Sequence, residues 1–265
     1  MKMILKNIKE YVSILKNNFK DKISKMKTKP SLAIIQVGNV ETSNRYIKNK
    51  IKDCKEIGIQ AHVYYYPEDI SENELCENIK LDQEFYDGII VQLPLPPHIR
   101  QKAVVAAIDP AKDVDGFCVN SSFDPATPKG IMDYLKYCEY DVTGRDVVII
   151  GRSDIVGKPL ARMMTNADAT VTLCHSKSKL ANHLYDADLI ISAVGKPHFL
   201  NCYSIHVPVI DVGINFDADG NLCGDCFNVE NRDVTPVPGG VGLLTRCALL
   251  DNVILAKEGK KNASN

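Results

Sequence analysis

The sequence predicts an α/β protein of two domains, each built around a mostly parallel sheet. Short apolar runs alternate with longer amphipathic stretches along the chain, and this rhythm is typical of βαβ units. The chain has 265 residues, enough for one large domain or two small ones. A turn-rich segment, NSSFDPATPKG (120–130), precedes a fresh strand–turn–helix pattern that starts at Val147. We therefore place a domain boundary inside this segment.

The first element is an amphipathic helix near the N-terminus. Its apolar residues recur at helical spacing: Ile4, Leu5, Ile8, Tyr11, Val12, Leu15, Phe19 and Ile23. We interpret it as a surface helix that covers a core. A basic helix lying on a membrane is the alternative, since both kinds of helix share this pattern.

The remaining elements follow from apolar periodicity. Strands are predicted over residues 32–37, 60–65, 88–92, 146–150, 170–173, 189–193 and 208–212. Helices are predicted over residues 42–57, 72–81, 97–107, 128–137, 158–166 and 243–257. Ser71 and Glu74 form a capping box at the start of the second of these helices. We expect a first domain over 1–122 and a second over 123–242, with the segment 243–265 packing back on the first.

Composition excludes several classes of protein. Lys and Arg number 32 against 33 Asp and Glu, so no net basic field exists to hold nucleic acid or an anionic membrane. No uncharged apolar stretch approaches the roughly 20 residues of a membrane helix. The nine cysteines are an odd number with irregular spacing, which favours reduced thiols in the cytoplasm.

The turn after the strand that ends at Ile150 is a candidate nucleotide site. Gly151 and Gly157 bracket it in GRSDIVGKP, and a helix follows, whose first amides attract phosphate. The dinucleotide pattern G-x-G-x-x-G would need glycine at Ser153, and the P-loop pattern fails on spacing. By itself the turn is equally compatible with a structural βα connection.

The next strand indicates which dinucleotide binds. It ends in CHSKSK (174–179), where an NAD-binding domain would carry a carboxylate for the ribose. Arg152, Ser176 and Lys177 suit a 2′-phosphate instead, so we expect NADP. The alternative is a solvated loop that is rich in lysine by chance.

Polar residues in the first half of the chain form a second candidate site. Tyr46 and Lys50 are four residues apart and share one helix face. Gln92 ends a strand, and Asp115 lies in the turn KDVDGF, where a carboxylate can accept the N–H groups of a heterocycle. Each of these features alone also fits surface or turn chemistry.

Two further motifs complete the inventory. Gly239 and Gly240 lie in TPVPGGVG, a loop that suits either close approach to a ligand or a domain hinge. Cys223 and Cys226 form a CxxC that has no second pair, so we expect no metal site.

Together these motifs resemble the bifunctional methylenetetrahydrofolate dehydrogenase/methenyltetrahydrofolate cyclohydrolase family along almost the full chain. The matching segments, in order, are SNRYIKNK, GIIVQLPLP, KDVDGF, TPKG, GRSDIVGKP, CHSKS, VIDVGIN and TPVPGGVG.

The resemblance implies an N-terminal α/β catalytic domain and a Rossmann-like NADP-binding domain, with a cleft between them, in a cytoplasmic homodimer. It implies oxidation of 5,10-methylenetetrahydrofolate with NADP+ and hydrolysis of the methenyl product to 10-formyltetrahydrofolate. These are steps of one-carbon metabolism that serve purine biosynthesis.

The resemblance also assigns residue roles. Lys50 would be the catalytic lysine, Tyr46 its neighbour over the folate, Gln92 a positioning amide and Asp115 the partner of the pterin. Gly239 and Gly240 would border the substrate. The residues that would line the cofactor are Gly151, Arg152, Ser153, Ser176 and Ile214.

We expect hydride transfer to need mainly alignment of the two reactants, whereas hydrolysis needs a base for water. Burial and a cationic intermediate favour an uncharged amine at Lys50. The alternatives are a dehydrogenase without cyclohydrolase activity, a two-domain dehydrogenase with another substrate, as in the shikimate dehydrogenase group, and a non-catalytic nucleotide-binding protein.

Overall fold

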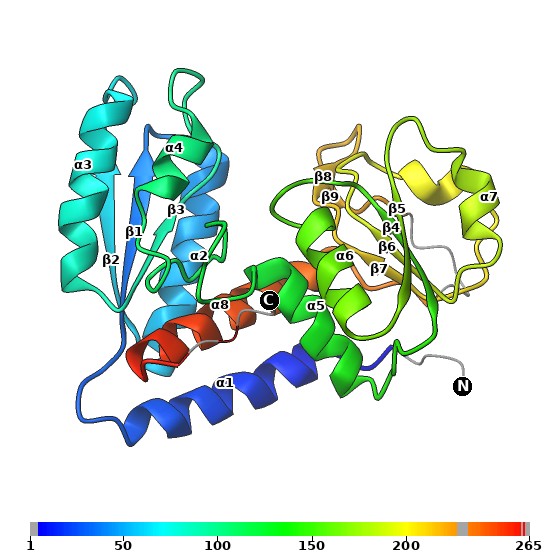
Figure 1. Cartoon of the computed structure of the whole chain (residues 1–265), viewed down its shortest axis with the longest axis horizontal. Helices are drawn as coiled ribbons and strands as arrows, with labels where there is room; N and C mark the ends of the chain where they lie inside the picture. The colour runs from blue at the N-terminus through cyan, green and yellow to red at the C-terminus, as the bar shows by residue number, and fades with distance from the viewer. Residues whose placement is uncertain (1–4, 227–232, 261, 263–265) are drawn as a thin grey trace. The chain divides into compact units, whose positions relative to one another are not determined.

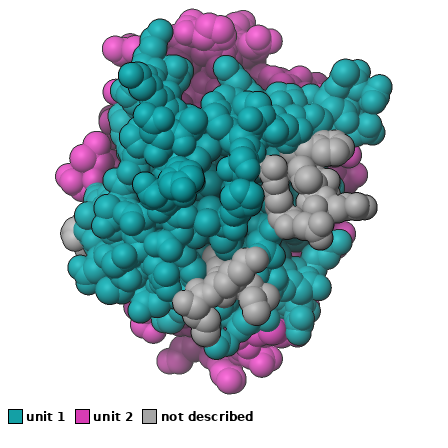
Figure 2. All heavy atoms as spheres, turned by 90° about the vertical axis from the view of Figure 1, so that its right-hand side faces the viewer, with its two compact units in different colours: residues 1–13, 127–245 teal, residues 14–126, 246–265 magenta. Residues whose placement is uncertain are grey.

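The computed structural model describes residues 5–226, 233–260 and 262, so Ile4 of the expected N-terminal helix lies outside the described residues. Contacts divide the chain into two compact units, which Figure 2 colours separately. Unit 1 comprises residues 1–13 and 127–245, and unit 2 comprises residues 14–126 and 246–265. Residues 1–13 thus group with the second half of the chain, which the sequence did not indicate.

Helices and strands alternate as the sequence predicts (Figure 1). The helices are α1 (Ile8–Ser24), α2 (Glu41–Ile57), α3 (Glu72–Asp82), η1 (Gln83–Phe85), α4 (Gln101–Ala106), α5 (Ala126–Tyr137), α6 (Gly157–Asn166), α7 (Leu180–Leu184), η2 (Phe199–Cys202) and α8 (Val241–Lys257). The strands are β1 (Ser31–Val37), β2 (Gln60–Tyr66), β3 (Gly88–Val91), β4 (Asp146–Ile150), β5 (Thr170–Cys174), β6 (Leu189–Ser192), β7 (Val209–Asp211), β8 (Asn215–Phe216) and β9 (Leu222–Cys223).

Unit 2 is built on a parallel sheet with the strand order β2-β1-β3. Alternate residues of a strand face opposite sides of its sheet. Ala33 and Ile35 of β1 join a buried cluster with residues of α3 and α4, while Leu32 and Ile34 are fully buried on the other side. The sheet is therefore covered on both faces, and this explains the continuous apolar run in β1.

Unit 1 is built on a second parallel sheet, of order β5-β4-β6-β7. Val148 and Ile150 of β4 pack in a cluster with residues of α7 and η2. Val147 and Ile149 are buried on the opposite side. In both units the carboxyl ends of adjacent parallel strands lie at one edge of the sheet, which is where α/β proteins place ligands.

The first and last helices each contain residues of both units. The division falls between Ser13 and Ile14 in α1 and between Thr245 and Arg246 in α8. Most of the apolar stripe predicted for α1 is buried, including Ile8, Phe19 and Ile23. The stripe thus packs against the protein, which agrees with the interpretation of α1 as a helix that covers a core.

Several short elements differ from the prediction. The helix expected over 97–107 begins only at Gln101, because the chain first makes a turn in which the Ile99 amide donates to the Pro96 carbonyl. Helix α7 and the antiparallel hairpin of β8 and β9 are too short for periodicity to reveal. The turn of that hairpin is the Asp219–Gly220–Asn221 segment.

None of the helices within the described residues has the length and apolarity needed to cross a membrane.

Candidate functional site

Helix α2 carries the predicted Tyr46 and Lys50. It buries Ile47, Cys54 and Ile57 on one face and ends at Gly58, whose left-handed conformation (φ 95°) caps the helix. Lys50 lies at the edge of this buried face and is half-buried. Tyr46, one turn earlier, is 41% exposed, so its ring is open to contact by a ligand.

The Gln92 side chain meets the Lys50 amine. Gln92 follows β3 directly, and its backbone amide donates to the Ile35 carbonyl at 2.8 Å. Lys50 Nζ donates to Gln92 Oε1 at 3.2 Å, while Gln92 Nε2 donates to the Leu93 carbonyl at 2.8 Å. The amide is thereby held with its oxygen toward the amine.

The two carboxylates of the KDVDGF turn have separate tasks. Asp113 is 1% exposed and accepts the amides of Cys118, at 2.6 Å, and Gly116, at 3.2 Å. It therefore holds the loop in shape. None of the described residues donates a hydrogen bond to the half-buried Asp115 carboxylate, which leaves it available to a ligand.

Burial is the main cause that raises the pKa of Asp115 above its usual range. The positive charge of Lys50 lowers this pKa and the negative charge of Asp113 raises it, so the three groups act on one another electrostatically. Asp115 also borders a cavity of unit 2 with largely apolar walls, among them Leu93, Val104 and Phe117. A half-buried carboxylate without a protein donor suits a ligand that carries N–H donors.

In unit 1, the turn after β4 is built for close backbone approach. A Cβ at Gly151 (φ 116°) would collide with the Ala193 carbonyl oxygen, and one at Gly157 would collide with the Gly151 carbonyl oxygen. Ser153 Oγ accepts the amides of Val156, at 3.2 Å, and Gly157, at 3.4 Å, and so holds the turn that leads into α6. The missing Cβ atoms leave a tight turn at a helix N-terminus, which fits a phosphate group.

The strand pairing brings Ser176 beside this turn. Ile150 is paired with Cys174, and the Gly151 amide donates to the Cys174 carbonyl at 3.0 Å. Arg152 and Ser176, which follow these strand ends, are both exposed. No carboxylate lies between Cys174 and Lys179. The residues present therefore fit a dinucleotide with a 2′-phosphate.

Ile214 and the glycine loop complete the predicted set in unit 1. Ile214 follows β7 and is 44% exposed. Gly239 has a φ of 97°, and a Cβ at Gly240 would collide with the Pro236 carbonyl oxygen, so both positions require glycine. A Cβ at Gly242 would lie 3.9 Å from Ile214 Cδ1, which places this loop beside Ile214.

Two buried carboxylates that sequence reasoning missed organise the loops of unit 1. Asp225 is fully buried and accepts four hydrogen bonds, from Ser192 Oγ (2.7 Å), the amides of Val194 (2.8 Å) and Lys196 (3.0 Å), and Asn215 Nδ2 (3.1 Å). Asp211 accepts the amides of Gly213, Asp225 and Cys226 at 2.8–3.0 Å.

Asp225 is the third residue of the CxxC motif, so the residue of this motif that stabilises the surrounding loops is its aspartate. All nine cysteines are free thiols. Among residues 5–226, 233–260 and 262, no group of three or more His, Cys, Asp or Glu side chains is arranged to hold a metal ion.

The predicted site residues thus form two sets. Tyr46, Lys50, Gln92 and Asp115 belong to unit 2, and the glycine turns, Arg152, Ser153, Ser176 and Ile214 belong to unit 1.

Comparison with protein families gives two matches. Residues 2–115 match the catalytic domain of tetrahydrofolate dehydrogenase/cyclohydrolase, and residues 125–261 match the NAD(P)-binding domain of the same family. Among curated relatives, the bifunctional protein FolD of Campylobacter concisus is 45% identical, with 91% of each chain covered. That of Nautilia profundicola is 41% identical, covering 91% of this chain and 93% of the relative.

Solved structures agree with these matches. The bifunctional FolD enzyme of Campylobacter jejuni superimposes with a TM-score of 0.91 at 39% identity, covering 95% of this chain and 97% of that one. The Trypanosoma brucei enzyme, solved with NADP cofactor and an inhibitor, gives a TM-score of 0.87 at 28% identity, with 97% and 98% covered. The two family models and these relatives span nearly the whole sequence, so the chain belongs to the tetrahydrofolate dehydrogenase/cyclohydrolase family.

Proposed function

We propose that Lys50 is the proton acceptor of a cyclohydrolase reaction, that Gln92 and Asp115 position the amine and the substrate, and that the turn after β4 binds the cofactor. The observation that carries this proposal is the contact of Lys50 Nζ with Gln92 Oε1 at 3.2 Å, within electrostatic reach of Asp115.

Membership in the family makes the chain a bifunctional, NADP-dependent enzyme of one-carbon metabolism. It oxidises 5,10-methylenetetrahydrofolate to the 5,10-methenyl cation and hydrolyses that cation to 10-formyltetrahydrofolate. Both activities therefore act on the same folate, first as an oxidoreductase and then as a hydrolase.

Hydrolysis is the step that needs a base from the protein. A water oxygen bonds to the methenyl carbon, and one water proton passes to the Lys50 amine, whose orientation is held by Gln92 Oε1. The bond from that carbon to N5 then breaks as the new hydroxyl group loses its proton to become the formyl oxygen. N5 takes up one proton, and the formyl group remains on N10. The net reaction consumes water and releases one proton.

Asp115 and Tyr46 hold the substrate in this scheme. Asp115 lacks a hydrogen-bond donor among the described residues, so its carboxylate accepts the paired N–H groups of the pterin ring. The exposed Tyr46 ring lies one helical turn before Lys50 and offers an apolar face to the folate. Gly239 and Gly240 allow the backbone to approach the substrate closely.

In the oxidation step the protein mainly aligns the folate with the cofactor, and no acid–base group is needed. When bound, NADP+ accepts a hydride from the carbon that bridges the two folate nitrogens. Gly151 and Ser153 shape the turn that would receive its phosphates, Arg152 and Ser176 would hold the 2′-phosphate, and the exposed side chain of Ile214 would contact the cofactor.

We further propose that the chain works as a cytoplasmic homodimer whose function divides near residues 122 and 123, without a nucleic-acid or membrane partner. The nine free thiols suit a reducing compartment. The family-model limits at residues 115 and 125 support that division.

Absorbance of the methenyl product tests this function. The purified protein should form it from 5,10-methylenetetrahydrofolate with NADP+, far more slowly with NAD+, and should consume added methenyl compound without any nucleotide. A preparation that oxidises the substrate but leaves the methenyl compound unhydrolysed would contradict the bifunctional assignment in favour of a dehydrogenase alone.

A further inference from the structure

An ion-pair cluster in unit 2 ties helix α2 to helices α1 and α8. At its centre is Asp53 of α2, which is 4% exposed. Lys16 Nζ of α1 lies 2.6 Å from Asp53 Oδ1, and Arg246 Nε of α8 lies 2.8 Å from Asp53 Oδ2. We call Lys16, Asp53, Glu56 and Arg246 the Asp53 cluster.

Glu56 extends the cluster along α2. Lys16 also pairs with Glu56 Oε2 at 2.7 Å, so one lysine of α1 bridges two carboxylates that are one turn apart on α2. The side chains of Lys16 and Arg246 are 14% and 24% exposed, which weakens screening by solvent. These contacts restrict both rotation and sliding of α2 against its two neighbours.

Lys50 lies one helical turn before Asp53 on the same helix. Residues three apart on a helix are neighbours, so a shift of α2 at Asp53 moves the Lys50 backbone by a similar amount. The Lys50 contact with Gln92 is already 3.2 Å long and has little room to lengthen before it is lost.

We propose that Asp53 and Arg246 are positioning residues for hydrolysis: their ion pair holds α2 at the place where the Lys50 amine meets Gln92. This inference rests on the role of Lys50 proposed above. Because oxidation does not use the amine as a base, disturbing the cluster should slow hydrolysis more than oxidation.

The test is the ratio of the hydrolysis rate to the oxidation rate, measured on one protein sample. This ratio does not depend on the fraction of protein that is folded, so a merely structural loss leaves it unchanged. In Arg246→Met it should fall about tenfold or more, since small displacements of a reacting group are costly. Arg246→Lys keeps the charge and should stay near the parent ratio.

Asp53→Asn provides a second variant should Arg246→Met fold poorly. It has almost the same shape as the parent side chain but removes the charge that both cations need, so the ratio should fall in the same direction. An unchanged ratio in either folded variant overturns the inference.

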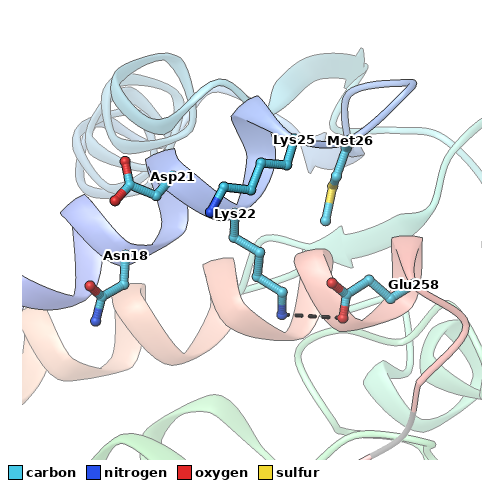
Figure 3. A pocket seen from close by; sticks show the side chains of 6 residues that line it. All are labelled: Asn18, Asp21, Lys22, Lys25, Met26 and Glu258. Atoms are coloured by element: carbon cyan, nitrogen blue, oxygen red, sulfur yellow. Dashed lines mark ion pairs between the residues drawn. The ribbon is translucent and has the colours of Figure 1, made fainter.

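Lys22→Met is a matched control. Lys22 Nζ of α1 pairs with Glu258 Oε2, just after α8, at 3.2 Å (Figure 3). This ion pair joins the same two helices but includes no residue of α2. Its loss should leave the ratio of the two rates at the parent value, and a fall like that of Arg246→Met would mean that any loosening of α1 and α8 suffices.

Lys50→Met in the same assay separates the two proposals. If it keeps normal hydrolysis, the role of Lys50 fails. If it abolishes hydrolysis while Arg246→Met and Asp53→Asn keep the parent ratio, the role of Lys50 stands and the positioning inference fails.

Discussion

The two parallel sheets end in loops that use buried carboxylates in opposite ways. At the edge of the unit 1 sheet, Asp211 and Asp225 each accept several hydrogen bonds from backbone amides, and Asp225 also accepts from polar side chains. In unit 2, Asp113 is used likewise, but its neighbour Asp115 faces the Lys50 charge with no donor among the residues that the structure describes.

The difference separates carboxylates that build a loop from one that serves a ligand. A carboxylate that accepts several backbone amides stabilises its loop, whereas one without a donor costs stability and is kept where a ligand can use it. The four predictions below test this distinction, from the largest expected effect to the smallest.

Lys50→Met removes the amine that unit 2 offers to the substrate. We expect hydrolysis of the methenyl compound to slow by about 10²–10⁴-fold, the usual contribution of a general base, with oxidation much less affected. Stopped-flow absorbance measures both rates. Lys48→Met, an exposed position of the same helix, is the control and should keep both activities. Retention of hydrolysis in Lys50→Met would remove this residue from the mechanism.

Asp225→Asn removes an acceptor oxygen from the buried carboxylate of unit 1 that accepts four hydrogen bonds. The variant replaces a carboxylate oxygen by an NH2 group, so some of the donors around it lose their acceptor. We expect the free energy of unfolding to fall by about 2–4 kcal/mol. Urea denaturation monitored by circular dichroism measures this change. A midpoint equal to that of the parent would show that Asp225 is not the organising group.

Ser176→Asp places a charge where we expect the 2′-phosphate. Repulsion between like charges should lower the preference for NADP+ over NAD+ by at least about tenfold. The readout is kcat/KM for each nucleotide. Ser176→Ala, which removes the hydroxyl without adding charge, should weaken NADP+ binding less. An unaltered preference in Ser176→Asp would place the 2′-phosphate elsewhere.

Asp115→Asn should weaken folate binding yet stabilise the protein. Burial raises the pKa of Asp115, so the folded state holds the proton more tightly than the unfolded state, and ionisation costs stability at neutral pH. We expect Tm at pH 7 to rise by about 1–3 °C. The gain should vanish below about pH 4, where the carboxyl is protonated in both states.

Asp113→Asn is the matched comparison for this last prediction. It loses an acceptor for the Cys118 and Gly116 amides, so its Tm should fall rather than rise. A rise in both variants, or in neither, would contradict the division of tasks between these two aspartates.

Predicted elements agree best with the structure where they depend on residues that are close together in the sequence. The strand predicted over 146–150 is observed with those bounds, and of the predicted capping box the structure shows one of its two bonds, the Glu74 amide donating to Ser71 Oγ at 3.2 Å. Both depend on side chains close in sequence. Helix α7 and the strands β8 and β9 were missed, because elements of a few residues carry no periodic signal.

The sequence by itself determined the α/β class, most of the element bounds and, through its motifs, the family and the candidate Lys50, Gln92, Asp115 and Ser176. Only the tertiary structure decided that Asp113 is bound within its loop while Asp115 is available, and that Asp53 meets Lys16 and Arg246. The reason is physical: apolar period and turn chemistry are local, whereas the partners of a buried charge come from distant segments that meet only on folding.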